Sequence, residues 1–284
     1  MNPKLSAALA AAIWGTTFIV TTMLLPPNPV FTAAMRSLVG GLPLLLLFRQ
    51  LPPRHWWGKV LLLGTLNCGI FFALFFVAAV RLPGGVAGTL QSLGPIFTVL
   101  IAWPLLGQRP TLLRLASVVA GAIGVLLLLT SGAIALDLVG ALAGIAAAVS
   151  LALGGLLLNR WGRPAPLLAF TAWQLVVGGI ELIVMAALIG DIPATITMQN
   201  ALGFAYVGLI GTCASFALWF YAIETAGAPS VVPFLLLVPV VAFALDASIK
   251  GFVPTTVQAL GAVIVLVSLL AGQIASRPRP TPAE

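Results

Sequence analysis

The chain is poor in charged residues, in histidine and in cysteine. Only 7% of its 284 residues are charged, whereas a soluble domain carries about a quarter. Cys68 and Cys213 fall inside apolar runs, and the single histidine, His55, stands alone between two such runs. This distribution excludes a disulfide framework and a clustered metal site. No Gly-x-x-x-x-Gly-Lys phosphate loop occurs either, which argues against the use of ATP, so we expect no cofactor.

Hydrophobic residues make up 61% of the chain and gather in long runs. A helix of about 20 apolar residues crosses the ~30 Å hydrocarbon layer of a bilayer. The loops between the runs are too short to hold a domain outside the membrane. The sequence therefore predicts an all-α integral membrane protein with ten transmembrane helices, at approximately 4–24, 30–48, 59–80, 85–106, 112–130, 136–159, 166–189, 200–224, 229–249 and 255–273.

The net charge of +7 comes mainly from basic residues in the short segments between these helices. If the amino terminus lies inside the cell, the outer loops hold only Arg81 and Lys250, and all other basic residues except Arg36 fall on inner segments. Such a bias orients a protein in the lipid bilayer. We therefore expect a multi-pass protein of the cell inner (plasma) membrane with both termini cytoplasmic. The charge then serves orientation, and we expect no nucleic-acid partner.

The second half of the chain repeats the first. At an offset of 144 residues, Pro95 meets Pro239 and Gly107 meets Gly251. An offset of 137 superimposes the first two helices of each half. Each copy holds five helices, an odd number, so the second copy must enter the bilayer upside down. The sequence predicts two inverted five-helix repeats, 1–132 and 133–276, and a disordered cytoplasmic tail, 277–284.

Pro95 and Pro239 lie near the middle of corresponding apolar runs. A proline cannot donate a hydrogen bond to the carbonyl four residues earlier, which is that of Gln91 or Leu235. Freed backbone groups at membrane depth are tolerated only where neighbours or a water-filled cavity satisfy them. Breaks at matching places in inverted repeats indicate a binding site between the halves, so we predict hinges at Pro95 and Pro239.

Three charged residues are clear candidates for a position within the membrane, away from the first turn and the last residue of their predicted helices. An ionised group at the bilayer centre costs at least ~2.5 kcal/mol. Asp246 is followed four residues later by Lys250, which favours a local ion pair at the surface. Arg36 and Glu181 lie at similar depth in the second and seventh helices. Two hypotheses fit them equally: a structural pair that joins these helices, and a gate or a site for a substrate carboxylate.

Uncharged polar and aromatic side chains complete the candidate site. Polar groups within membrane helices either bond to neighbouring helices or line a cavity. Aromatic rings either pack between helices or form a wall on which an organic substrate stacks. Gln91 and Ser92 rank first because they lie beside the carbonyl freed by Pro95. The candidate substrate-binding residues are Trp14, Thr16, Asn67, Phe72, Gln91, Ser92, Trp173, Gln174, Phe216 and Trp219.

In the order of these features, the sequence resembles members of the drug/metabolite transporter superfamily, in its EamA branch. That family commonly has a Glu directly after the Gly that ends the fourth helix of each repeat. Here Gln108 and Phe252 stand at those positions, so no role of that Glu carries over. The resemblance spans nearly the whole chain and rests on Trp14-Gly15 with Thr16, Arg36, Trp173-Gln174, and the Pro95/Gly107 and Pro239/Gly251 pairs.

The resemblance implies a secondary transporter that moves small organic metabolites by alternating access. Within that range we predict an exporter of amino acids, aromatic ones included, similar to the YddG-type exporters. Amide, hydroxyl and aromatic groups with little charge suit zwitterions better than sugar phosphates. Export of drugs or other metabolites is the alternative within the superfamily, and the oligomeric state is left open.

Two other classes of function fit the sequence less well. An intramembrane enzyme needs a nucleophile with a base, paired carboxylates or a metal at membrane depth. Glu181 and Asp246 are the only acids that we expect to be buried at membrane depth, so we expect no enzyme. A channel needs a continuous pore lined by rings of like groups, and the two mid-helix prolines favour a carrier instead.

Overall fold

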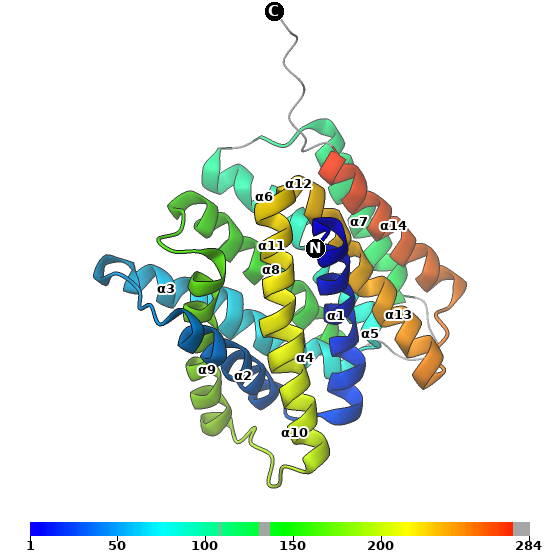
Figure 1. The fold of residues 1–284 in the computed structure, drawn as a ribbon. Helices are drawn as coiled ribbons and strands as arrows, with labels where there is room; N and C mark the ends of the chain where they lie inside the picture. The colour runs from blue at the N-terminus through cyan, green and yellow to red at the C-terminus, as the bar shows by residue number, and fades with distance from the viewer. Residues whose placement is uncertain (108, 131–136, 275–284) are drawn as a thin grey trace, which may run out of the picture.

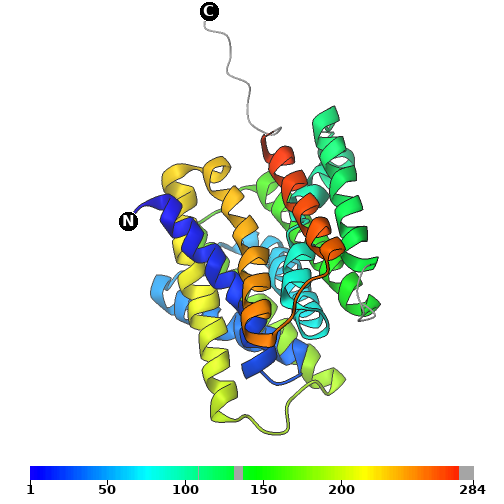
Figure 2. The same ribbon diagram turned by 90° about the vertical axis from the view of Figure 1, so that its right-hand side faces the viewer.

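The computed structural model describes residues 1–107, 109–130 and 137–274, which form a bundle of helices with no strand among them. The amino terminus and the end of the last helix lie at the same end of the bundle in both views (Figures 1 and 2). The first-half elements are α1 (Pro3–Leu24), α2 (Pro29–Phe48), η1 (Arg54–Trp56), α3 (Trp57–Gly64), η2 (Thr65–Ile70), α4 (Phe71–Arg81), α5 (Gly84–Gln91), α6 (Gly94–Leu106) and α7 (Leu112–Thr130). The second-half elements are α8 (Leu138–Trp161), α9 (Leu167–Ile189), α10 (Met198–Ala205), η3 (Tyr206–Ala214), α11 (Ser215–Ala226), α12 (Ala228–Val231), η4 (Val232–Leu236), α13 (Leu237–Lys250) and α14 (Thr256–Ile274).

The prediction of an all-α membrane protein is confirmed. Eight helical stretches in the described ranges are long and apolar enough to cross a bilayer, and two shorter apolar helices, Leu112–Leu127 and Thr256–Gly272, accompany them. The count of ten spans therefore stays a prediction. The predicted tail, 277–284, the start of the sixth helix at 136 and the boundary at 132/133 lie outside the described residues, as does Gln108.

Local sequence signals fix several helix ends. Gly107 and Gly251 end the two copies of the fourth helix with φ of 68° and 66°, a left-handed conformation that glycine adopts without strain. Asp137 caps α8 by accepting a hydrogen bond from the Gly140 N–H at 3.0 Å, and it pairs with Arg81 at 2.6 Å. That N–H and the guanidinium lower the pKa of the exposed Asp137 carboxyl.

Two of the predicted helices are interrupted by π-helix. The third predicted helix, 59–80, contains η2, and the eighth, 200–224, contains η3. At the repeat offset of 144, residues 65–70 fall on 209–214, so the same irregularity occurs in both halves. A single π turn inserts one residue into a helix and occurs frequently at functional sites.

The two proline-containing helices are irregular at matching places. Ser92 and Leu93, between α5 and α6, have ψ of −8° and −7°, far from the α-helical value of about −42°. In the second half, the 3₁₀ helix η4 precedes α13, and Pro239 lies in the first turn of α13. The irregular residues of both copies therefore lie just before the proline.

The Asp246–Lys250 pair forms at 3.2 Å, but its predicted place at the surface is wrong. Asp246 is only 1% exposed, and its second oxygen accepts a hydrogen bond from the Gly85 N–H at 3.1 Å. The first N–H groups of a helix have no partner within that helix and attract an anion. The carboxylate thus ties α13 to the beginning of α5.

Corresponding helices of the two halves pack against one another. α2 lies against α9, and α7 lies against α14. A β-carbon on Gly124 in α7 would lie 2.8 Å from the Gly261 carbonyl oxygen in α14, so these helices approach as closely as glycine allows. Two pairs of repeat-related helices therefore join the two halves.

Candidate functional site

The carbonyl of Gly211, in the π-helix η3, receives three side-chain donors. Trp14 Nε1 of α1 donates to it at 3.1 Å, Arg36 Nη2 of α2 at 3.2 Å, and Ser215 Oγ of α11 at 2.8 Å. Since an α-helical carbonyl is normally occupied by the N–H four residues later, π geometry makes this convergence possible. We call Trp14, Arg36, Gly211, Thr212 and Ser215 the Gly211 centre.

Arg36 is a buried cation in this centre, with only 5% of its surface exposed. Its Nε donates to Thr212 Oγ1 at 3.1 Å, and its Cζ lies 4.8 Å from the centroid of the Phe72 ring. Two further rings, those of Phe75 and Phe76, lie within 5.8 Å. No carboxylate of the described residues lies within 4 Å of its guanidinium. The charge is therefore stabilised by dipoles and aromatic faces alone.

Glu181 of α9 has a different partner. Its Oε1 accepts a hydrogen bond from Thr65 Oγ1, at the start of η2, at 2.7 Å. In this conformation Arg36 and Glu181 do not pair, and each instead contacts a π-helix of the opposite repeat. The ion pair expected under the structural hypothesis is thus absent from this state.

The first-half π-helix, η2, is held in a corresponding way. Ser150 Oγ of α8 donates to the Leu66 carbonyl at 2.7 Å. At the offset of 137, α8 is the repeat counterpart of α1, which supplies Trp14 to η3. Each π-helix therefore accepts a hydrogen bond from the first helix of the other half. Asn67 Nδ2 of η2 also donates to Gln174 Oε1 of α9 at 2.8 Å.

The predicted aromatic wall partly assembles around α1 and α11. The Trp14 ring lies 5.6 Å from that of Phe216 and 5.2 Å from that of Trp219. Phe216 in turn stacks on Phe220 at 5.5 Å with nearly parallel rings. Two residues after Trp14 in α1, Thr16 Oγ1 shares a 2.6 Å hydrogen bond with the Tyr206 hydroxyl. These rings and hydroxyls adjoin the Gly211 centre.

Three of the predicted residues have other surroundings. Trp173 is buried against Phe170, in one cluster with Trp56, and its Nε1 donates to the Gln50 carbonyl at 2.7 Å in the loop after α2. Ser92 Oγ, just after α5, donates back to the Gly88 carbonyl of α5 at 2.9 Å. The Oε1 atom of Gln91 is buried and has no hydrogen-bond partner. Of the three, only Gln91 keeps an unused polar group.

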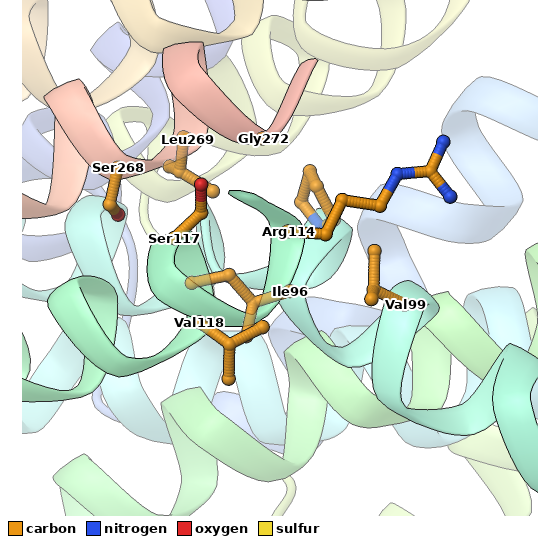
Figure 3. Close-up of a pocket in the computed structure, with 9 residues that line it drawn as sticks. Ile96, Val99, Arg114, Ser117, Val118, Ser268, Leu269 and Gly272 are labelled. Atoms are coloured by element: carbon orange, nitrogen blue, oxygen red, sulfur yellow. The ribbon is translucent and has the colours of Figure 1, made fainter. Parts of the chain in front are cut away.

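A small cavity of about 60 Å³ lies between α6, α7 and α14 (Figure 3). Pro95 is the only predicted site residue among those that line it. Arg114, Ser117 and Ser268 supply its polar groups, and Figure 3 shows the Arg114 guanidinium pointing away from both serines. Elsewhere in the described ranges, no three His, Cys, Asp or Glu side chains lie together as metal ligands.

The sequence profile of the EamA-like transporter family matches residues 3–130 and, a second time, residues 138–271. The chain belongs to this family. The double match agrees with a two-repeat membrane fold in which each half is one EamA-like unit. This EamA-like protein is therefore a multi-pass membrane transporter and not an enzyme.

Its relatives cover nearly the same length. Protein PecM of Dickeya dadantii (strain 3937) is 37% identical over 249 residues, which cover 86% of this chain and 83% of PecM. A "Probable amino-acid metabolite efflux pump" of Escherichia coli (strain K12) is 27% identical over 281 residues, 93% of this EamA-like chain and 92% of the relative. A solved structure with a TM-score of 0.67 and 19% identity covers 96% of both chains and shows the same fold.

Proposed function

We propose that this EamA-like transporter exports amino acids, aromatic ones included, by alternating access. The observation that carries the proposal is the repeated irregularity before Pro95 and Pro239, at matching places in two halves of one scaffold. Two related halves with broken helices provide two nearly equivalent arrangements, which is what alternating access requires. The amino-acid efflux named for the Escherichia coli relative supports the choice of substrate.

The groups around α1, η3 and α11 have the chemistry that an amino acid needs. Trp14 and Phe216 offer aromatic faces for an apolar side chain. On a different element, at the end of α5, Gln91 offers a buried amide oxygen that has no partner among the described residues. Hydroxyl and amide groups bind a zwitterion without adding net charge to the membrane interior. The same site handles small and aromatic amino acids if the ring faces accept side chains of several sizes.

Flux of labelled amino acids through proteoliposomes tests this function. Wild-type protein is expected to move phenylalanine and leucine across the vesicle membrane, and Gln91→Ala to raise the concentration for half-maximal flux by about tenfold. The amide oxygen of Gln91 accepts no hydrogen bond from the described residues, so we expect its loss to leave the fold intact and to remove one substrate contact. If folded wild-type protein moved other metabolites but no amino acid, the amino-acid substrate would be wrong and those metabolites would be its substrates.

We further propose that both termini of this inner-membrane protein face the cytoplasm. The proposal is supported by the excess of basic residues on the segments at that end. In a Cys68→Ala, Cys213→Ala background, Arg54→Cys and Arg163→Cys are expected to react with a membrane-impermeant maleimide only after the cells are opened. Ala194→Cys, in the exposed loop between α9 and α10, serves as the outer control and should react in intact cells. Labelling of position 54 or 163 from outside would reverse the orientation.

A further inference from the structure

The Gly211 centre holds a guanidinium that is only partly satisfied. Arg36 Nε and Nη2 bond to Thr212 and to the Gly211 carbonyl, whereas Nη1 makes no hydrogen bond to any of the residues that the structure describes. A buried cation without a counter-ion is costly, and within a membrane such a residue marks a functional site more often than a structural one. Among the described residues, the cation of the Gly211 centre therefore has no anionic partner, and some of its N–H groups have no acceptor.

A second unused donor lies beside the first. Thr17 is 1% exposed, and its hydroxyl is buried with no hydrogen-bond partner. A helical threonine usually donates to a carbonyl one turn earlier, as Thr21 does to the Thr17 carbonyl at 2.6 Å, but Thr17 does not. A β-carbon placed on Gly211 would lie 3.7 Å from this hydroxyl oxygen. Arg36 and Thr17 thus flank the same glycine from α2 and α1.

Two donors around one glycine, one of them charged, fit an anion that accepts hydrogen bonds. The Phe72 ring lies against the Arg36 guanidinium, and Trp14 donates to the Gly211 carbonyl. The Gly211 centre, as defined above, contains no Lys and no second Arg. A phosphate carries up to two charges and is usually held by several cations, whereas a carboxylate carries one and matches a single guanidinium. The chemistry favours an organic monocarboxylate.

We propose that Arg36 and Thr17 bind the carboxylate group of the transported substrate at the Gly211 centre. The inference rests on the proposed function and deepens it, because it places the carboxylate of the amino acid at η3 and its side chain toward the rings of Trp14 and Phe216. Arg36 then has two roles: it ties α2 to η3, and its remaining N–H groups receive the substrate. If Arg36 were purely structural, the Thr17 hydroxyl would have no role, since it makes no hydrogen bond within the described part of the chain.

The test compares two threonines that are alike except in their position. Thr17→Val removes the hydroxyl beside Gly211, and Thr32→Val, the control, removes another buried hydroxyl that also has no partner, on α2. Both variants should fold, since neither loses a hydrogen bond. Thermal unfolding of purified protein is followed while phenylalanine, phenylacetate or phenylalaninamide is added. The amide keeps the ring and the amine but lacks the carboxylate.

Phenylalanine and phenylacetate are expected to raise the unfolding temperature of wild-type protein, and phenylalaninamide is not. Thr17→Val should raise the half-saturating concentration of both carboxylates about tenfold, the effect of one hydrogen bond to a charged group, and Thr32→Val should leave it unchanged. Arg36→Gln should abolish the carboxylate effect. Even where that variant unfolds, the comparison of the two threonine variants decides the question.

The outcomes separate this inference from the proposed function. Flux of phenylalanine with equal flux of phenylalaninamide, or equal behaviour of the two threonine variants, overturns the carboxylate site and leaves amino-acid export standing. No stabilisation by either carboxylate also overturns the site. Stabilisation by phenylacetate that depends on Thr17, without any amino-acid flux, supports the site and removes amino-acid export.

Discussion

Gly178→Ala is expected to destabilise the protein by about 1–3 kcal/mol, the cost of overpacking a tight contact. A β-carbon at this position in α9 would lie 2.7 Å from the Gly69 nitrogen and 2.9 Å from the Gly64 carbonyl oxygen. Both are backbone atoms, which cannot rotate away as a side chain does. α9 would therefore have to move off η2, which also strains the hydrogen bonds that Gln174 and Glu181 make to η2.

Gly155→Ala is the matched control. This glycine lies in α8, and nothing lies within 4 Å of the place of its β-carbon. The same substitution should there stabilise the helix by up to about 1 kcal/mol, because alanine has the higher helix propensity. Denaturation of both variants in the same detergent measures the difference. Equal stability of the two variants would mean that α9 and η2 can move apart to accept a β-carbon without a loss of stability.

Pro95→Ala is expected to leave the protein folded and to slow amino-acid flux by one to two orders of magnitude. The new N–H can bond to the Gln91 carbonyl and straighten the helix across Ser92 and Leu93. A regained bond and a relieved clash amount to ~3 kcal/mol in a helix interior, and a bias of that size toward one access state changes the ratio of the two access states about a hundredfold. Proteoliposome flux measures the rate.

Pro239→Ala should slow transport less than Pro95→Ala. In the Pro239→Ala variant, Pro233 would still lie within the 3₁₀ helix η4. The substitution would therefore restore only part of a regular helix. Pro104→Ala is the control, since it makes the same chemical change inside α6 but away from the break. Full-rate flux by both hinge variants, or equal slowing by Pro104→Ala, would remove the hinge assignment.

Composition and repetition predicted much of this fold. The apolar runs located the helices because burial in lipid demands them, and Gly107 and Gly251 marked two helix ends because the left-handed conformation favours glycine. The prolines at 95 and 239 predicted where helices become irregular. These features depend on local chemistry, which can be read along the chain.

The hydrogen bonds between the two halves could not be predicted from the sequence. A π turn adds one residue to a helix without changing its hydrophobic composition. The sequence therefore does not mark η2 and η3, apart from a few polar residues such as Asn67 and Thr212 within them. The partners of Arg36, and the burial of Asp246 against Gly85, depend on which helices meet in three dimensions. Periodicity along one helix contains no such information.

Each half of the chain supplies a hydrogen bond to the π-helix of the other half. Trp14 of the first half satisfies the carbonyl of Gly211 in the second, and Ser150 of the second half satisfies the carbonyl of Leu66 in the first. A polypeptide that ended at Thr130 would contain the acceptor Leu66 without its donor. Two such fragments, encoded separately and produced in one cell, would each lack a hydrogen bond that the other supplies, so the duplicated chain resembles a covalently joined heterodimer.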